Sequence, residues 1–180
     1  MKKMWLRSMT LLFAAILFCG LAAAGDLTAS GLKPASEPAQ AAPLESAELM
    51  PAGSLGAPLV QGKTGSQITI PVWVHSGEQP IDAFGIDIQF DSAVLSFVSA
   101  DPGSLDPNWL MFQVQETAPG ALRAGGFVLE SNIPPNSSGS LVDLHFKVIA
   151  DTNNASVTLL KPVDDLEKFQ LNPGLVQAVK

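Results

Sequence analysis

From about residue 59 onward, apolar and polar positions alternate in short runs along the chain. The clearest run is GIDIQFD, residues 85–91, in which Ile86, Ile88 and Phe90 alternate with small or polar residues. This period of two is typical of a β-strand with one face in a core. Similar runs, separated by Gly, Pro, Asn and Asp, predict eight strands and a weaker ninth at 59–63; the eight cover 66–75, 82–91, 93–100, 109–117, 121–130, 140–150, 155–163 and 175–180.

No segment carries a sustained apolar period of 3.6, so the pattern predicts an all-β domain. About 120 residues with eight or nine strands are enough for one two-sheet sandwich. The expected inward side chains are Ile68, Ile70, Val72, Val74, Phe84, Ile86, Ile88, Phe90, Val94, Leu95, Phe97, Leu110, Phe112, Val114, Leu144, Phe146 and Val148.

Three glycines lie at places where the backbone is expected to depart from a regular strand. Gly125 and Gly126 interrupt the alternation of ALRAGGFVLE, which predicts a β-bulge. Pro119 and Gly120 suit the two central positions of a type II turn, where the second residue has a positive φ.

The first 58 residues differ from the rest of the chain in composition and lack the alternating pattern. Residues 1–24 combine a basic start with a short apolar run, which is typical of a cleaved signal peptide, and Ala24 ends a small-residue cleavage site. The only cysteine, Cys19, follows the bulky Phe18, so a lipid anchor is not expected. Residues 25–58, rich in Ala, Pro and Ser, read as a flexible linker. We therefore expect a secreted protein, extracellular or periplasmic, with its folded domain at 59–180 and no disulfide.

Charge narrows the range of partners. Loss of the leader removes three positive charges from a net charge of −7, which leaves −10 on the exported part. An acidic surface repels phosphate backbones, so nucleic acid is a poor candidate partner. After the leader, no stretch is long and apolar enough to predict a membrane span.

The sequence offers few candidates for catalytic residues. His75 and His145 are isolated, without a zinc-ligand spacing around either, and no nucleophile motif accompanies them. The acids Asp164, Asp165 and Glu167 could in principle serve glycoside hydrolysis, but neighbouring acids in a polar loop seldom face each other across a substrate. We therefore predict no enzyme and no catalytic residue.

One turn offers hard oxygen ligands from Asp151, Asn153 and Asn154. Carboxylate and amide oxygens suit calcium, yet a hairpin connection uses the same residues because they tolerate a left-handed backbone. Both interpretations stay open, and no metal site or cofactor is assigned.

Four motifs in order resemble the cohesin domain, the receptor module of cellulosome scaffolds and related bacterial surface proteins. They are GKTGSQITIPVWV, IDAFGIDIQFDSAVLSFVSADPGSL, ETAPGALRAGGF and GSLVDLHFKV, which together extend over nearly all of the chain after the linker. The most specific parts are Phe90 and Asp91 followed by Val94 and Leu95, and the run from Gly120 to Phe127. Where the family commonly has tyrosine and proline around the aspartate, this chain has Phe90 and Ser92.

The resemblance implies a nine-stranded jelly-roll β-sandwich that binds a small calcium-loaded protein, the dockerin, in polysaccharide breakdown or cell-surface assembly. It places the docking surface on the third, fifth, sixth and eighth strands. Ala83 and Gly85 stand where well-known members carry Asn and Asp; these residues permit close approach but cannot form the same hydrogen bonds. The partner-binding candidates are Asp87, Gln89, Gln113, Gln115, Arg123 and Glu130.

The alternative on the same scaffold is a carbohydrate-binding module with a polysaccharide ligand. Such a module needs exposed planar aromatics on which sugars stack. Trp73 and Trp109 alternate out of phase with their apolar neighbours, so both are expected to be partly exposed.

Overall fold

The computed structural model describes residues 50–152, 154–172 and 174–178. The expected signal peptide and most of the expected linker lie outside these residues. Within the described part every regular element is a β-strand, and no helix there is long and apolar enough to cross a bilayer.

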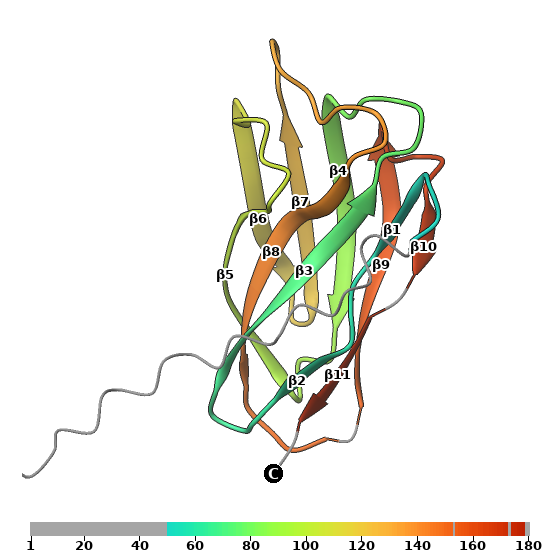
Figure 1. The fold of residues 1–180 in the computed structure, drawn as a ribbon. Helices are drawn as coiled ribbons and strands as arrows, with labels where there is room; N and C mark the ends of the chain where they lie inside the picture. The colour runs from blue at the N-terminus through green and yellow to red at the C-terminus, as the bar shows by residue number, and fades with distance from the viewer. Residues whose placement is uncertain (1–49, 153, 173, 179–180) are drawn as a thin grey trace, which may run out of the picture. The chain divides into compact units, whose positions relative to one another are not determined.

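Two sheets form the predicted sandwich (Figure 1). One sheet has five strands in the order β10-β1-β3-β8-β5, and the other has six in the order β2-β11-β9-β4-β7-β6. The bounds are β1 Ser54–Gly56, β2 Val60–Gly62, β3 Gln67–His75, β4 Ala83–Phe90, β5 Leu95–Pro102, β6 Met111–Ala118, β7 Ala121–Phe127, β8 Ser138–Val148, β9 Ala155–Asp164, β10 Gln170–Asn172 and β11 Gly174–Ala178. All nine predicted strands are present, and β1 and β10 are two further short ones.

The core lies between the sheets and includes an aromatic cluster. Phe146 of β8 contacts Phe90 of β4 at a centroid distance of 4.9 Å and Phe97 of β5 at 5.8 Å, both edge to face. Ile70 and Ile88, one from each sheet, are fully buried. Burial of this continuous apolar layer is the main stabilising contribution to the fold.

The inward pattern is confirmed for β3, β4, β5 and β8, whereas β6 departs from it. Leu110, expected inside, is 61% exposed and precedes the strand. Phe112 and Val114 are only partly buried, though both pack against the core. The reason is that β6 is an edge strand with a neighbour on one side only, so it is covered less than the central strands.

The bulge predicted at Gly125 and Gly126 is wrong, because both glycines pair in continuous register with β4 and β6. Gly126 is needed for another reason: a Cβ there would lie 2.8 Å from the Phe84 ring and 3.1 Å from a backbone oxygen of β6. The turn at Gly120 is as expected, with a φ of 79°.

The domain begins earlier than residue 59. β1 pairs antiparallel with β3 and parallel with β10, and Leu55 at its centre is fully buried. Residues 54–58 therefore belong to the folded domain, and the expected linker is shorter than predicted at this end.

Candidate protein-docking face

The outer face of the six-stranded sheet is the surface on which most of the predicted partner-binding residues meet. Four neighbouring strands carry this surface, in the order β9-β4-β7-β6, with β6 at the edge of the sheet. Alternation along β4 buries Phe84, Ile86 and Ile88 and turns the intervening side chains outward. The outward residues of the four strands are Ala83, Gly85, Asp87, Gln89, Met111, Gln113, Gln115, Ala121, Arg123, Gly125, Phe127, Thr158, Leu160, Lys161 and Val163.

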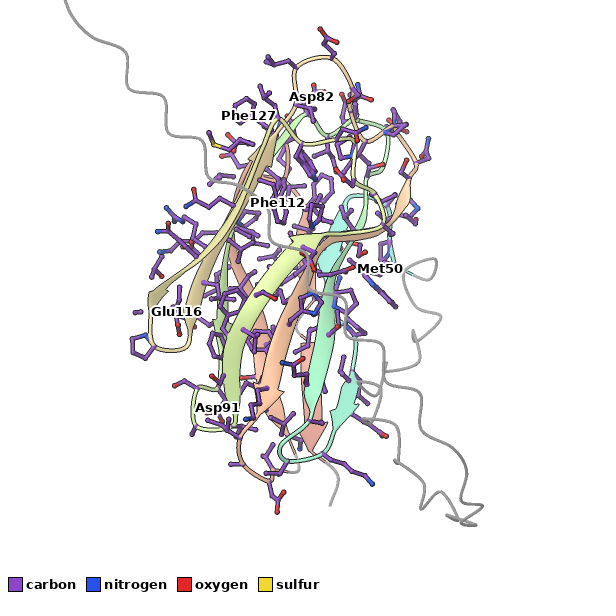
Figure 2. All side chains as sticks on the ribbon, turned by 90° about the vertical axis from the view of Figure 1, so that its left-hand side faces the viewer. Met50, Asp82, Asp91, Phe112, Glu116 and Phe127 are labelled. Atoms are coloured by element: carbon purple, nitrogen blue, oxygen red, sulfur yellow. The ribbon has the colours of Figure 1, made fainter. Side chains whose placement is uncertain are left out.

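Cross-strand register arranges this face in four rows, of which the last contains Gln89, Ala121 and Thr158. An apolar row contains Met111, Phe127 and Ala83, which lie at one end of β6, β7 and β4. Figure 2 shows Phe127 beside Asp82 at this end, where the amide of residue 128 donates to the Asp82 carbonyl oxygen at 2.9 Å. The face thus has an apolar margin toward the end that carries Phe127.

The next two rows differ sharply from each other in chemistry. A row of small residues is centred on the Gly125–Gly85 pair, with Gln113 on one side and Val163 on the other. Beyond it, a charged row has Arg123 opposite Asp87.

The charged row is a compact ion cluster. Arg123 Nε donates to Asp87 Oδ1 at 2.7 Å, and Lys161 Nζ lies 3.7 Å from Asp87 Oδ2. The Asp87 side chain is 22% exposed, whereas those of Arg123 and Lys161 are 64% and 77% exposed. The bond from Arg123, aided by the charges of both cations, lowers the pKa of Asp87 against the smaller opposing effect of burial, and Asp87 raises the pKa of Arg123. Two exposed cations therefore surround one covered carboxylate.

Lys161 is a member of the cluster that the sequence reasoning missed. The register between β4 and β9 shifts between Gly85 and Asp87, and Lys161 has a φ of 45°. This irregularity adds a residue to β9 and brings the ammonium group next to Asp87. A signal was present in the sequence, because Leu159 and Leu160 break the alternation and Pro162 is typical of a bulge or edge position.

The row of small residues forms the floor of a hollow of about 600 Å³, which we call the glycine hollow. Met111 and Phe127 line one end, Arg123 and Lys161 line the other, and Val163 lines a side. A Cβ on Gly125 would lie 3.2 Å from the Phe84 carbonyl oxygen, and one on Gly85 would lie 2.6 Å from a Val163 methyl group. Larger residues at either position would raise the floor.

Of the remaining predicted partner-binding residues, three lie on the four-strand face and one does not. Gln113 and Gln115 are exposed on β6, and the amide nitrogen of Gln113 donates to Gln115 at 3.0 Å. Gln89 is exposed at the end of β4, one row beyond Asp87. Glu130 follows β7 in an exposed bend, so it does not belong to the four-strand face.

Of the two candidate tryptophans, Trp73 is buried, and Trp109 has the partial exposure that was predicted. The prediction that Trp73 is partly exposed is wrong: it is 7% exposed, because a register shift between Val72 and Trp73 interrupts the alternation of β3. Trp109 is partly buried and packs edge to face on Phe84 at 5.0 Å. Its Nε1 is buried and finds no hydrogen-bond partner among the described residues.

One of the candidate acids and one of the candidate histidines lie in structural hydrogen bonds. The Asp165 carboxylate accepts backbone hydrogen bonds from Asp82 and Ala83 at 2.8 and 2.9 Å, which fixes the start of β4. His145 lies on the opposite sheet and bridges Asp101 and Thr69 at 2.9 and 3.0 Å.

The candidate calcium turn is only partly described, since Asn153 lies outside the described residues. The Asp151 carboxylate accepts a hydrogen bond from the Thr64 hydroxyl group. In the part of the chain that the structure describes, no group of three or more His, Cys, Asp or Glu side chains is arranged to hold a metal ion.

A family model for the cohesin domain matches residues 54–166. The chain belongs to the cohesin family. The match begins at the first residue of β1, which agrees with the domain start seen in the structure. A search of curated proteins gives no match.

Solved cohesins share the fold at low sequence identity. The sixth cohesin of scaffoldin B from Acetivibrio cellulolyticus, solved with a mutant dockerin, is 22% identical with a TM-score of 0.61 over 70% of this chain and 98% of its own. A non-cellulosomal cohesin from the archaeon Archaeoglobus fulgidus is 20% identical with a TM-score of 0.58, over 71% and 91%. The OlpA cohesin of Clostridium thermocellum, also solved with a dockerin, is 13% identical with a TM-score of 0.60, over 70% and 98%.

Proposed function

We propose that this cohesin is a secreted, non-catalytic recognition module that binds a dockerin-bearing protein through the outer face of β9, β4, β7 and β6. The carrying observation is the face itself, which leaves the Asp87–Arg123–Lys161 cluster and the glycine hollow open on one surface. A surface with fixed charges beside an apolar recess suits specific capture of a protein.

Two further observations support the proposal. Several cohesins of the same fold were solved in complex with dockerins. Of the acids and histidines first considered for catalysis, Asp165 accepts backbone hydrogen bonds at the start of β4, and His145 lies between Asp101 and Thr69. A role in polysaccharide breakdown or cell-surface assembly follows from the family resemblance and is part of this proposal.

Charge reversal on the two outer faces tests the proposal. Purified dockerin modules, including those of the Acetivibrio and Clostridium complexes, are titrated into the full chain in solution, and the affinity is measured by calorimetry. Arg123→Glu should weaken capture at least ~10-fold, since it repels Asp87 and reverses a charge on the docking face. Lys147→Glu, on an exposed position of β8 in the other sheet, is the matched control and should change affinity less than about twofold.

The opposite pattern would contradict the proposal. Capture that is lost with Lys147→Glu but kept with Arg123→Glu would move the binding surface to the five-stranded sheet. Failure of every dockerin to bind would remove this partner class.

A further inference from the structure

The glycine hollow differs from the rest of the docking face because its floor is backbone rather than side chain. Gly125 and Gly85 face each other across β7 and β4, and Ala83 is the next outward residue of β4. These three neighbouring positions have no side chain or only a methyl group, so the surface is lower here than over Gln113, Arg123 and Lys161, whose side chains are long. A flat partner surface would leave this recess unfilled, at the cost of lost packing contacts.

The ends of the hollow have opposite polarity. Met111 is 56% exposed at the apolar end, opposite Phe127. At the other end, Arg123 and Lys161 share the single carboxylate of Asp87, so these three groups carry a net charge of +1. An apolar group is therefore favoured over the floor and an anionic group over the cations.

A fourth charge fixes the direction in which such a partner lies. A carboxylate oxygen of Asp164 is 3.7 Å from the place that a Cβ on Gly85 would occupy, at the β9 side of the hollow. An acidic partner residue is repelled there and attracted at Lys161, so only one orientation satisfies both sites.

The two rows are close enough together for one partner helix to reach both. Gly85 and Asp87 are two residues apart on one strand, which separates the hollow from the charged row by about 7 Å. Side chains one turn apart on a helix, at i and i+4, have Cβ atoms roughly 5–6 Å apart and can diverge to meet both rows.

We infer that the docking face takes a partner helix carrying a large apolar side chain, which fills the glycine hollow, and an acidic residue one turn away, which meets Arg123 and Lys161. This inference rests on the proposed function and adds the chemistry of the bound residues. It also explains how Ala83 and Gly85 serve binding, since they supply space instead of hydrogen bonds.

The test is a displayed library built on the dockerin of the Acetivibrio complex, with its exposed helix positions randomised and selected against the full chain. Enriched clones should share Leu, Ile, Met or Phe at one position and Asp or Glu one turn away. Ala83→Leu and Gly125→Ala narrow the hollow and should weaken binding of these clones at least ~10-fold and ~3-fold, respectively. Ser96→Leu adds the same leucine to an exposed position of β5 in the other sheet and should change affinity less than about twofold.

A charge swap tests the second contact. Lys161→Glu should weaken the selected clones, and replacing their acidic residue by lysine should restore binding to this variant alone. Circular dichroism melting of each variant establishes that the fold is retained.

The outcomes separate this inference from the proposed function. Some clones could lose binding with Arg123→Glu yet carry polar residues at the enriched positions and tolerate Ala83→Leu. That result would overturn the inference, while the proposed docking face would remain supported. A library without any enriched clone, or with clones insensitive to every variant of the face, would overturn both.

Discussion

Asp87 and Arg123 lie directly opposite each other on β4 and β7, and the Asp87 carboxylate accepts a 2.7 Å hydrogen bond from Arg123 Nε. The same carboxylate also lies 3.7 Å from Lys161 Nζ on β9. The Asp87 side chain therefore links β4 to β7 and β9 and holds two exposed cations in place. This order in the free protein lowers the entropy cost of presenting those cations to a partner.

The first prediction concerns the pH dependence of this cluster. The pKa of Asp87 is lowered from 3.8 by the bond from Arg123 and by both cations. Its stabilising contribution is therefore present above the unfolded value and is lost as pH falls through the lower folded value. Asp87→Asn should reduce stability by about 0.2–1 kcal/mol at pH 7, as for exposed ion pairs.

Thermal melts of both proteins between pH 2 and pH 7 measure this effect. The two melting temperatures should converge at the acidic end, and added salt should reduce their difference at pH 7. An equal difference at both ends of the pH range would mean that Asp87 acts through shape rather than charge.

The second prediction compares two adjacent residues of β4 that face opposite ways. Ile88 is fully buried and Gln89 is exposed. Ile88→Asp places an unpaired charge between the sheets and should cost more than ~3 kcal/mol, enough to unfold much of the protein. Gln89→Asp, the matched control, should leave the unfolding midpoint in urea nearly unchanged. Similar midpoints for both variants would contradict the assignment of the two faces.

Alternation alone located the long strands because each has one buried face. GIDIQFD predicted β4 and its inward side chains, and SLVDLHFKVIA did the same for β8. The short strands β1 and β10 have three residues each and show no comparable period. They exist because they pair with distant segments, and local sequence carries little information about such pairing.

The errors in the site have the same physical origin. Trp73 is buried because a register shift in β3 breaks the alternation that predicted partial exposure. Lys161 joins Asp87 because β9 has an extra residue opposite β4. Asp87, Arg123, Gln113 and Gln115 could be predicted together, since regular pairing of β4, β7 and β6 is enough to bring them to one face.

The third prediction concerns the start of the domain. Leu55 is fully buried in β1, whereas Leu59 is 39% exposed just after it. Leu55→Ala should destabilise the protein by about 2–5 kcal/mol, as for other buried leucines. Leu59→Ala is the control and should cost less than ~1 kcal/mol. Urea unfolding of the two variants decides, and equal costs would return the domain boundary to residue 59.

The fourth prediction concerns the opposite sheet, where Asp143 of β8 faces Asp101 of β5. Burial raises the pKa of Asp143 from 3.8, against smaller opposing effects of a hydrogen bond with Ser140 and of the charge of His145, and the charge of Asp101 adds the smallest effect, in the same direction as burial. The ionised form is thus less favourable in the folded protein than in the unfolded chain. This penalty is absent well below pH 3.8, where the carboxyl group is protonated in both states; it grows as pH rises from 3.8 to the higher folded pKa and is constant above it.

Asp143→Asn keeps the shape of the side chain and removes the charge, so it should raise the melting temperature at pH 7 and have little effect at pH 3. The gain should be less than about 1 kcal/mol, since water still screens a half-buried group. Glu116→Gln, which removes an exposed charge from the edge strand β6, is the control and should change stability little at either pH. Scanning calorimetry at the two pH values measures both variants. A loss of stability with Asp143→Asn at pH 7 would mean that the ionised carboxylate stabilises the sheet through its neighbours, which would reverse the sign assigned to its burial.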